Sequence, residues 1–263
     1  MKWGGRNPAL YLINRSDKAP SGTTTVISCN GVSGEGVLSS ILGSEAVAST
    51  PILHLRNSAD QNFFGWLTGS QYASSKIIME GTATQTFSGS KIAWTGGIEV
   101  RSGTLIITGR ASIDSNVNHG DLDMLGGQFG ILAGSASTQG VFWMNNLNYT
   151  SGDILLNVNT STSDMIKLDG TIIDKGFSDG VNFILSGNLD LLVDNFVKIV
   201  EWGSISEIAD SDYHANKYGD LYAVFDSRDD GLYVMYAAVP EPATFAAFFG
   251  TIALAIAALR KRN

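Results

Sequence analysis

Short stretches in which every second residue is apolar, separated by glycine, run through most of this chain. Ile154, Leu156 and Val158 alternate with polar residues in this way. A spacing of two places the apolar side chains on one face of a β-strand. Glycines between such stretches leave too little room for helices of ordinary length: Gly96, Gly97, Gly103, Gly109, Gly126, Gly127, Gly130, Gly134 and Gly140. The sequence therefore predicts an all-β body, in which the best helical candidate is the short segment 204–209.

Composition favours an exported β protein and excludes some partners. The net charge is −8, and only 16% of the 263 residues are charged. Removing residues 239–263 takes away three of the 17 basic and one of the 25 acidic residues, so the remaining body carries a net charge of −10. An acidic surface repels nucleic acid, which is therefore not an expected partner. The single cysteine, Cys29, forms no internal disulfide, so burial and backbone ladders have to hold the fold.

One segment of the body carries a family resemblance. Residues 86–109 read TFSGSKIAWTGGIEVRSGTLIITG, an order of aromatic, TGG, strand, SGTL and strand that resembles the autotransporter-associated β-strand repeat. The resemblance implies a right-handed parallel β-helix, in which each short strand stacks on the one below. Ile98, Val100, Leu105 and Ile107 would then point inward, with Gly103 at the corner. A β-sandwich is the alternative fold, because it shows the same alternation.

The end of the body predicts an antiparallel hairpin. Apolar residues alternate up to Phe225 and again from Leu232, and the acidic turn between them ends at Gly231, where a positive φ is expected. Such a hairpin would cap the open end of a solenoid and cover its unpaired strand edges. The body is therefore expected to span residues 30–238.

The last residues, VPEPATFAAFFGTIALAIAALRKRN, have three parts. Pro240, Glu241 and Pro242 form a rigid element, and an uncharged run over residues 243–259 follows. As a helix this run spans roughly 25 Å, close to the hydrocarbon thickness of a bilayer. It predicts one transmembrane helix, in which the side chains that favour insertion are Phe245, Phe248, Phe249, Ile252, Leu254, Ile256 and Leu259. Arg260, Lys261 and Arg262 form the cytoplasmic basic stop and leave the body outside.

This tripartite order resembles a PEP-CTERM protein-sorting signal, here residues 239–263. The resemblance implies that an exosortase-type membrane enzyme recognises Pro240, Glu241 and Pro242 and cleaves near them. It implies a transient stay in the inner membrane. Release to the cell surface or extracellular matrix of a Gram-negative bacterium follows, where exopolysaccharide is an expected partner.

The N-terminal part lacks the signal peptide that export requires. The apolar run at residues 9–13 is shorter than an h-region. The sequence therefore predicts an irregular segment over residues 1–29 and an internal start, either a mis-assigned start codon or a fragment of a longer gene.

No catalytic or metal-binding motif is evident. His54, His119 and His214 lie far apart in the sequence, and the group from His119 to Asp123 is interpreted as a polar surface turn. Asp226, Asp229 and Asp230 have the composition of a calcium loop without its spacing. The tryptophans in strand-like contexts are expected to pack in the core: Trp66, Trp94, Trp143 and Trp202. The sequence favours a non-catalytic surface or matrix protein without a cofactor; a polysaccharide-active enzyme on the same scaffold is the alternative.

Overall fold

The structure is a computed structural model of the chain. It describes residues 2–3, 9–11, 24–39, 50–68, 76–89, 92–93, 96–108, 119–132, 140–158 and 163–238. This part of the chain is built from strands, with two short 3-10 turns, η1 (Leu189–Leu192) and η2 (Asp210–Asp212). Segment 204–209, the expected helical candidate, is not helical.

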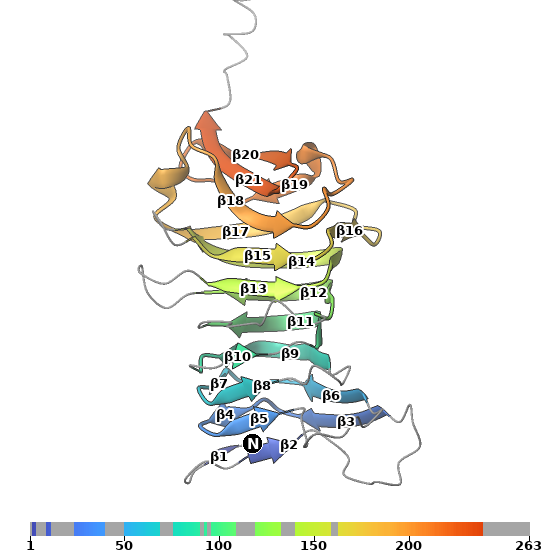
Figure 1. Cartoon of the computed structure of the whole chain (residues 1–263). Helices are drawn as coiled ribbons and strands as arrows, with labels where there is room; N and C mark the ends of the chain where they lie inside the picture. Colours follow the sequence, from blue (N-terminus) through green and yellow to red (C-terminus); the bar gives the residue numbers. More distant parts are fainter. Residues whose placement is uncertain are drawn as a thin grey trace, which may run out of the picture.

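The strands form a parallel solenoid of about five turns, in which each coil of the chain lies directly above the previous one (Figure 1). The largest sheet has twelve strands. They are β1 (Lys2–Trp3), β3 (Thr24–Cys29), β4 (Ser33–Gly34), β6 (Thr50–Leu55), β7 (Gln61–Phe63), β9 (Lys76–Phe87), β11 (Gly97–Ile107), β12 (Leu122–Ile131), β14 (Leu147–Val158), β16 (Ile172–Asp174), β17 (Val181–Gly187) and β19 (Tyr213–Ala215).

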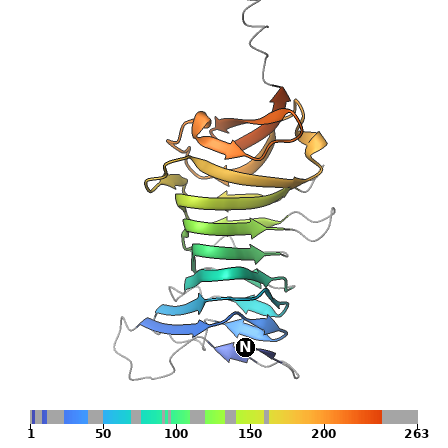
Figure 2. The same ribbon diagram turned by 180° about the vertical axis from the view of Figure 1, so that it is seen from behind.

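Two smaller sheets complete the coils. In the N-terminal half, four parallel strands are β2 (Ala9–Tyr11), β5 (Val37–Ser39), β8 (Trp66–Thr68) and β10 (Ile92–Ala93). In the C-terminal half, five strands are β13 (Val141–Met144), β15 (Met165–Leu168), β18 (Val197–Trp202), β20 (Leu221–Arg228) and β21 (Gly231–Ala238). Seen from behind, the strands of the largest sheet lie one above another along the length of the solenoid (Figure 2).

The core consists of columns of apolar side chains from successive coils. In one column the strand register aligns Ile77, Ile98, Leu122 and Leu147, all fully buried. Val100, Leu105 and Ile107 are buried too, as predicted from the alternation. Burying one such side chain contributes about 1.5–3 kcal/mol, so stacking coil upon coil stabilises the solenoid without a cross-link. Because the coils pair in parallel, the sandwich alternative is wrong.

The long strands bend where glycine allows it. The pairing of β11 with β9 shifts register around Ser102, next to Gly103, which has a φ of +71°. A Cβ atom on Gly103 would lie 2.9 Å from the carbonyl oxygen of Gly81 in the coil below. The predicted corner at Gly103 is therefore confirmed, and it needs glycine both for its conformation and for the close approach of two coils.

The predicted hairpin is confirmed. β20 and β21 pair antiparallel, Gly231 has a φ of +153°, and β21 continues the sheet by pairing antiparallel with β18. Phe225 of β20 packs against the rings of Phe183 and Tyr213, each at a centroid distance of 5.8 Å. The hairpin thus covers the apolar columns at the C-terminal end of the solenoid (Figure 1).

The N-terminal prediction differs from the structure. β1, β2 and β3 precede residue 30 and pair in parallel with β4, β5 and β6. These strands belong to the solenoid because their backbone ladders continue it, so residues 1–29 are not simply an irregular segment.

The predicted sorting signal, residues 239–263 with Pro240, Glu241, Pro242 and the apolar run 243–259, lies outside the described residues. Within the described ranges, no helix has the length and apolar character needed to cross a membrane.

Candidate functional site

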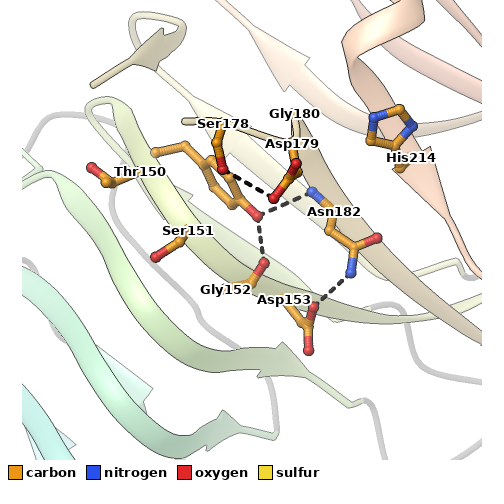
Figure 3. A pocket seen from close by; sticks show the side chains of 10 residues that line it. Thr150, Ser151, Gly152, Asp153, Ser178, Asp179, Gly180, Asn182 and His214 are labelled. Carbon is orange, nitrogen blue, oxygen red and sulfur yellow. Dashed lines mark hydrogen bonds between the residues drawn. The ribbon is translucent and has the colours of Figure 1, made fainter. Parts of the chain in front are cut away.

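A pocket of about 340 Å³ opens at the corner of the coil that contains β14 (Figure 3). β14 turns this corner at Gly152, which has a φ of +110°. The next coil does not follow it closely, because the loop 175–180 separates β16 from β17 and interrupts their pairing with β14. This loop forms one wall of the pocket. The lining residues are Tyr149, Thr150, Ser151, Gly152, Asp153, Ser178, Asp179, Gly180, Asn182 and His214.

Tyr149 anchors the pocket. Its ring is buried, its hydroxyl donates to the carbonyl oxygen of Gly152, and the same hydroxyl accepts the backbone N–H of Asn182 at 3.1 Å. Burial raises the pKa of Tyr149, so the phenol stays protonated. Its hydroxyl is therefore used to fix the corner to β17 and is poorly suited to act as a base.

Asp153 belongs to a ladder of polar side chains on the outer face of the sheet. One carboxylate oxygen accepts from the amide of Asn182 at 2.6 Å and the other from the amide of Gln128 at 2.9 Å. Gln128 in turn accepts the hydroxyl of Thr104 at 3.1 Å. The strand register aligns these four residues in successive coils. Both oxygens of Asp153 are thus engaged in joining coils.

Asp179 and His214 are exposed titratable groups of the pocket, beside the exposed hydroxyl groups of Ser151 and Ser178. Asp179 accepts the hydroxyl of its neighbour Ser178 at 2.9 Å. His214 lies next to Asn182 in the strand register, and in Figure 3 its ring stands apart from Asp153. The pocket therefore presents hydroxyl, amide, carboxylate and imidazole groups, which can form hydrogen bonds with a hydroxyl-rich ligand.

A second polar network covers the first half of the long strands. Lys76 contacts Glu99 and, at 3.0 Å, Asp123, while Arg101 contacts Glu99 and, at 3.3 Å, Glu80. Burial alone would raise the pKa of Glu99, but hydrogen bonds from Lys76 and Arg101 hold it below its usual range. These charges neutralise one another across neighbouring coils, so this face also serves cohesion.

His119 is buried, so its prediction as part of a surface turn is wrong. Its Nδ1 lies 2.8 Å from a carboxylate oxygen of Asp169, and its ring stacks on Trp143 at a centroid distance of 4.9 Å. The indole N–H of Trp143 donates to the other oxygen of Asp169 at 2.5 Å. A histidine can be buried here because the next coil supplies an aromatic face and the coil after it supplies a carboxylate. Asp121 accepts hydrogen bonds from Asn145 and Asn146 in the next coil.

The other candidate ligands lie apart. The Nε2 atom of His54 is 2.6 Å from Glu80, and Cys29 is a free thiol whose pKa is raised by burial. Asp226 pairs with Arg228 at 2.7 Å and Asp230 with Lys198 at 2.6 Å, so both act in ion pairs. In the part of the chain that the structure describes, no three His, Cys, Asp or Glu side chains gather as metal ligands.

The tryptophans differ in burial. Trp202 is buried as predicted, Trp143 is half-buried, and Trp94 lies outside the described residues. Trp66 is 48% exposed, so its predicted place in the core is wrong. The strand register places Leu67, its neighbour, inside the coil, and the alternation along β8 then turns Trp66 outward.

Comparison of the chain with models of known protein families and with curated proteins found no match to either.

The pocket was not predicted from the sequence, because its residues come from three coils. A signal existed in the outward positions of the alternating strands. Thr104, Gln128, Asp153 and Asn182 are polar residues on strands whose inward neighbours are apolar. Only the register, however, aligns them.

Proposed function

We propose that this chain is a non-catalytic component of the cell surface or extracellular matrix of a Gram-negative bacterium. One observation carries the proposal: the polar side chains on the outer faces bond one coil to the next. Thr104, Gln128, Asp153 and Asn182 form one such series. Side chains used in this way make a stiff scaffold, whereas a catalytic acid or base has to exchange a proton with a substrate. The coil sense is the right-handed one that the repeat resemblance implies.

Export and processing follow the PEP-CTERM resemblance of residues 239–263. The inner membrane holds residues 243–259 transiently, and an exosortase-type enzyme acts near Glu241. The position of the signal supports this order of events. β21 ends at the exposed Ala238, at the capped end of the solenoid, two residues before Pro240 (Figure 2). A protease therefore reaches the signal without unfolding the coils.

The test separates recognition from anchoring. The tagged chain, carrying a functional signal peptide, is expressed in a host with its own sorting enzyme and followed by fractionation. Glu241→Ala should accumulate at full length in the membrane, because the apolar run is intact and the recognised residue is gone. Thr244→Ala, a neighbouring change outside the triplet, should be released like the parent.

Neutral replacements of Arg260, Lys261 and Arg262 should instead weaken the topology, because the cytoplasmic anchor is lost. Equal release of the parent and of Glu241→Ala, or retention of an uncleaved parent, contradicts the sorting proposal.

A polysaccharide-active enzyme is the second candidate, and the pocket in Figure 3 is the observation that favours it. Asp153, Asp179 and His214 line the same cavity. An enzyme would depolymerise a polysaccharide and lose that activity in Asp179→Ala and His214→Ala. The scaffold proposal expects no shortening of polysaccharide chains by the parent, measured by reducing ends and by the absorbance of unsaturated products.

A further inference from the structure

The corner between β7 and β8 is bare backbone. Gly36, Gly65 and Gly89 approach one another closely at this corner in successive coils; the strands β7 and β8 that flank it are in the lower half of Figure 1. The N–H of Trp66 donates to the carbonyl oxygen of Gly36 at 2.7 Å. A Cβ atom on Gly65 would lie 2.2 Å from that oxygen, and one on Gly89 would lie 1.6 Å from the oxygen of Gly65. The coils therefore approach too closely here for any side chain on the glycines.

Two large aromatic rings flank this corner. Phe64 and Trp66 are 49% and 48% exposed, whereas Phe63, the last residue of β7, is buried against Phe87. Full burial of either ring would add hydrophobic stabilisation, as it does for a core side chain. Both rings, within three residues of each other, stay partly in contact with solvent. The buried Phe63 and Leu67 on either side hold the backbone and fix both rings outward.

Polar side chains border the rings. Asn62, two residues before Phe64, accepts the hydroxyl of Ser88 from the next coil at 2.7 Å. Glu35 lies exposed in the previous coil, one residue after Gly34, which pairs with Phe63. The corner thus combines apolar rings with amide, hydroxyl and carboxylate groups.

We propose that the Phe64–Trp66 corner binds a neutral polysaccharide. A pyranose ring has a face of C–H groups, which packs on an aromatic ring, and a rim of hydroxyl groups, which hydrogen-bond to amide, hydroxyl and carboxylate groups. The net charge of −8 and the nearby Glu35 disfavour an anionic chain.

The size of the surface also argues for a sugar. A stable protein–protein interface buries about 800 Å² on each partner, far more than two side chains provide. One or two sugar rings need no more than this corner. Many copies in a matrix, each binding weakly, would hold one polymer by multivalency. The inference rests on the proposed function, since it names the site at which a matrix protein would contact exopolysaccharide.

The experiment is affinity electrophoresis of the full chain in mild non-ionic detergent. The gels contain dextran or hydroxyethyl cellulose as neutral probes and alginate as the anionic probe. We expect retardation by a neutral probe and none by alginate. The double variant Phe64→Ala, Trp66→Ala should lose at least tenfold in apparent affinity, and Trp66→Phe should lose less, because it keeps an aromatic face.

The matched control is Tyr222→Ala, Val224→Ala, which removes two exposed side chains at the opposite end of the solenoid and should bind like the parent. Circular dichroism checks that each variant is folded. For the parent, a change in tryptophan fluorescence on adding the neutral probe, absent in Trp66→Phe, gives a second measure that does not depend on the alanine variants.

Three outcomes overturn the proposal. The parent binds no neutral probe, or the double variant binds as well as the parent. In the third, light scattering gives a smaller mass for the double variant than for the parent, which would mean that the corner is a contact between copies of the chain. Release in the fractionation assay is independent of this corner. If the parent is sorted correctly but binds no neutral polysaccharide, polysaccharide binding at the corner is refuted, whereas the sorting proposal is unaffected.

Discussion

Asp169 shows how a single residue joins three successive coils. Its two carboxylate oxygens bind Nδ1 of His119 and Nε1 of Trp143, which stack on each other. The Nζ atom of Lys167 lies over the Trp143 ring, 4.7 Å from its centroid, and pairs with a carboxylate oxygen of Glu201 at 2.5 Å. The carboxylate is therefore the hydrogen-bond partner of Nδ1 of the buried His119, whose Nε2 has no partner among the described residues.

Asp169→Ala should lower the free energy of unfolding by about 1–3 kcal/mol, because it leaves His119 buried without its partner. Asp179→Ala is the matched control, since that carboxylate is exposed and bonds only its own neighbour among the contacts described, and it should stay within about 0.5 kcal/mol of the parent. Denaturant titration measures both. Equal effects of the two changes would contradict this role of Asp169.

Ionisation of Tyr213 lowers the free energy of unfolding at alkaline pH. Burial raises its pKa to about 12. The unfolded phenol titrates near pH 10, so the folded state holds the proton more tightly. The protonated phenol therefore contributes about 3 kcal/mol to the free energy of unfolding. This contribution is complete below about pH 10 and is lost as the pH rises to about 12. Tyr213→Phe cannot ionise at this position.

The free energy of unfolding of Tyr213→Phe should therefore fall less steeply between pH 10 and 12 than that of the parent. The values at pH 7 give the baseline for each protein. Parallel curves for the two proteins over this window would show that ionisation of Tyr213 does not matter.

At the scale of elements, the β20–β21 hairpin has two different faces. Phe225 is 7% exposed and contacts Phe183 and Tyr213, whereas Val224 is 39% exposed on the opposite face. The hairpin covers apolar columns that would otherwise meet water, and its antiparallel pairing with β18 ends the parallel stack.

Phe225→Ala should cost about 3–5 kcal/mol, since it opens a cavity at the end of the core. Val224→Ala should change stability by no more than about 0.5 kcal/mol. Hydrogen exchange should also show lost protection of β17 and β19 in Phe225→Ala, because its ring covers their inner faces. Full protection there would mean that the hairpin is not the cap.

At the scale of the whole molecule, the solenoid is held by stacked columns and outer polar ladders. Its free thiol, Cys29, takes part in no disulfide. Each coil contacts its neighbours through parallel ladders, and the sequence of coils runs from the N-terminal strands to the hairpin (Figure 1).

The melting temperature of the full chain should therefore be unchanged by a chelator and by a reducing agent, and its circular dichroism spectrum should be of the β type. A metal bound to the folded state alone would raise the melting temperature by linkage, and chelation would then lower it. A clear drop that calcium restores would contradict this expectation and favour the enzyme alternative.

Much of the fold was predictable because alternation records burial. Ile98, Val100, Leu105 and Ile107 were predicted to point inward and are buried. Gly103 lies at a corner as expected, and Gly231 has the expected positive φ. The boundary at residue 30 was wrong, because β3 continues the ladder of β6 although no clear alternation marks it.

The candidate sites were less predictable. A tryptophan in a strand has the same local pattern whether it faces inward or outward, so Trp66 was misplaced and Trp202 was not. His119 was misplaced for a related reason: the carboxylate that permits its burial is fifty positions away in the sequence.

The sequence by itself determined that this chain forms short strands with glycine corners, because side-chain alternation and backbone freedom are local properties. It also determined the hairpin at the end of the body. Only the tertiary structure decided which residues meet: the pocket at Gly152, the pairing of Asp169 with His119, and the exposed rings beside Gly65. These depend on the register between coils about 25 positions apart, and register is set by the packing of the whole column.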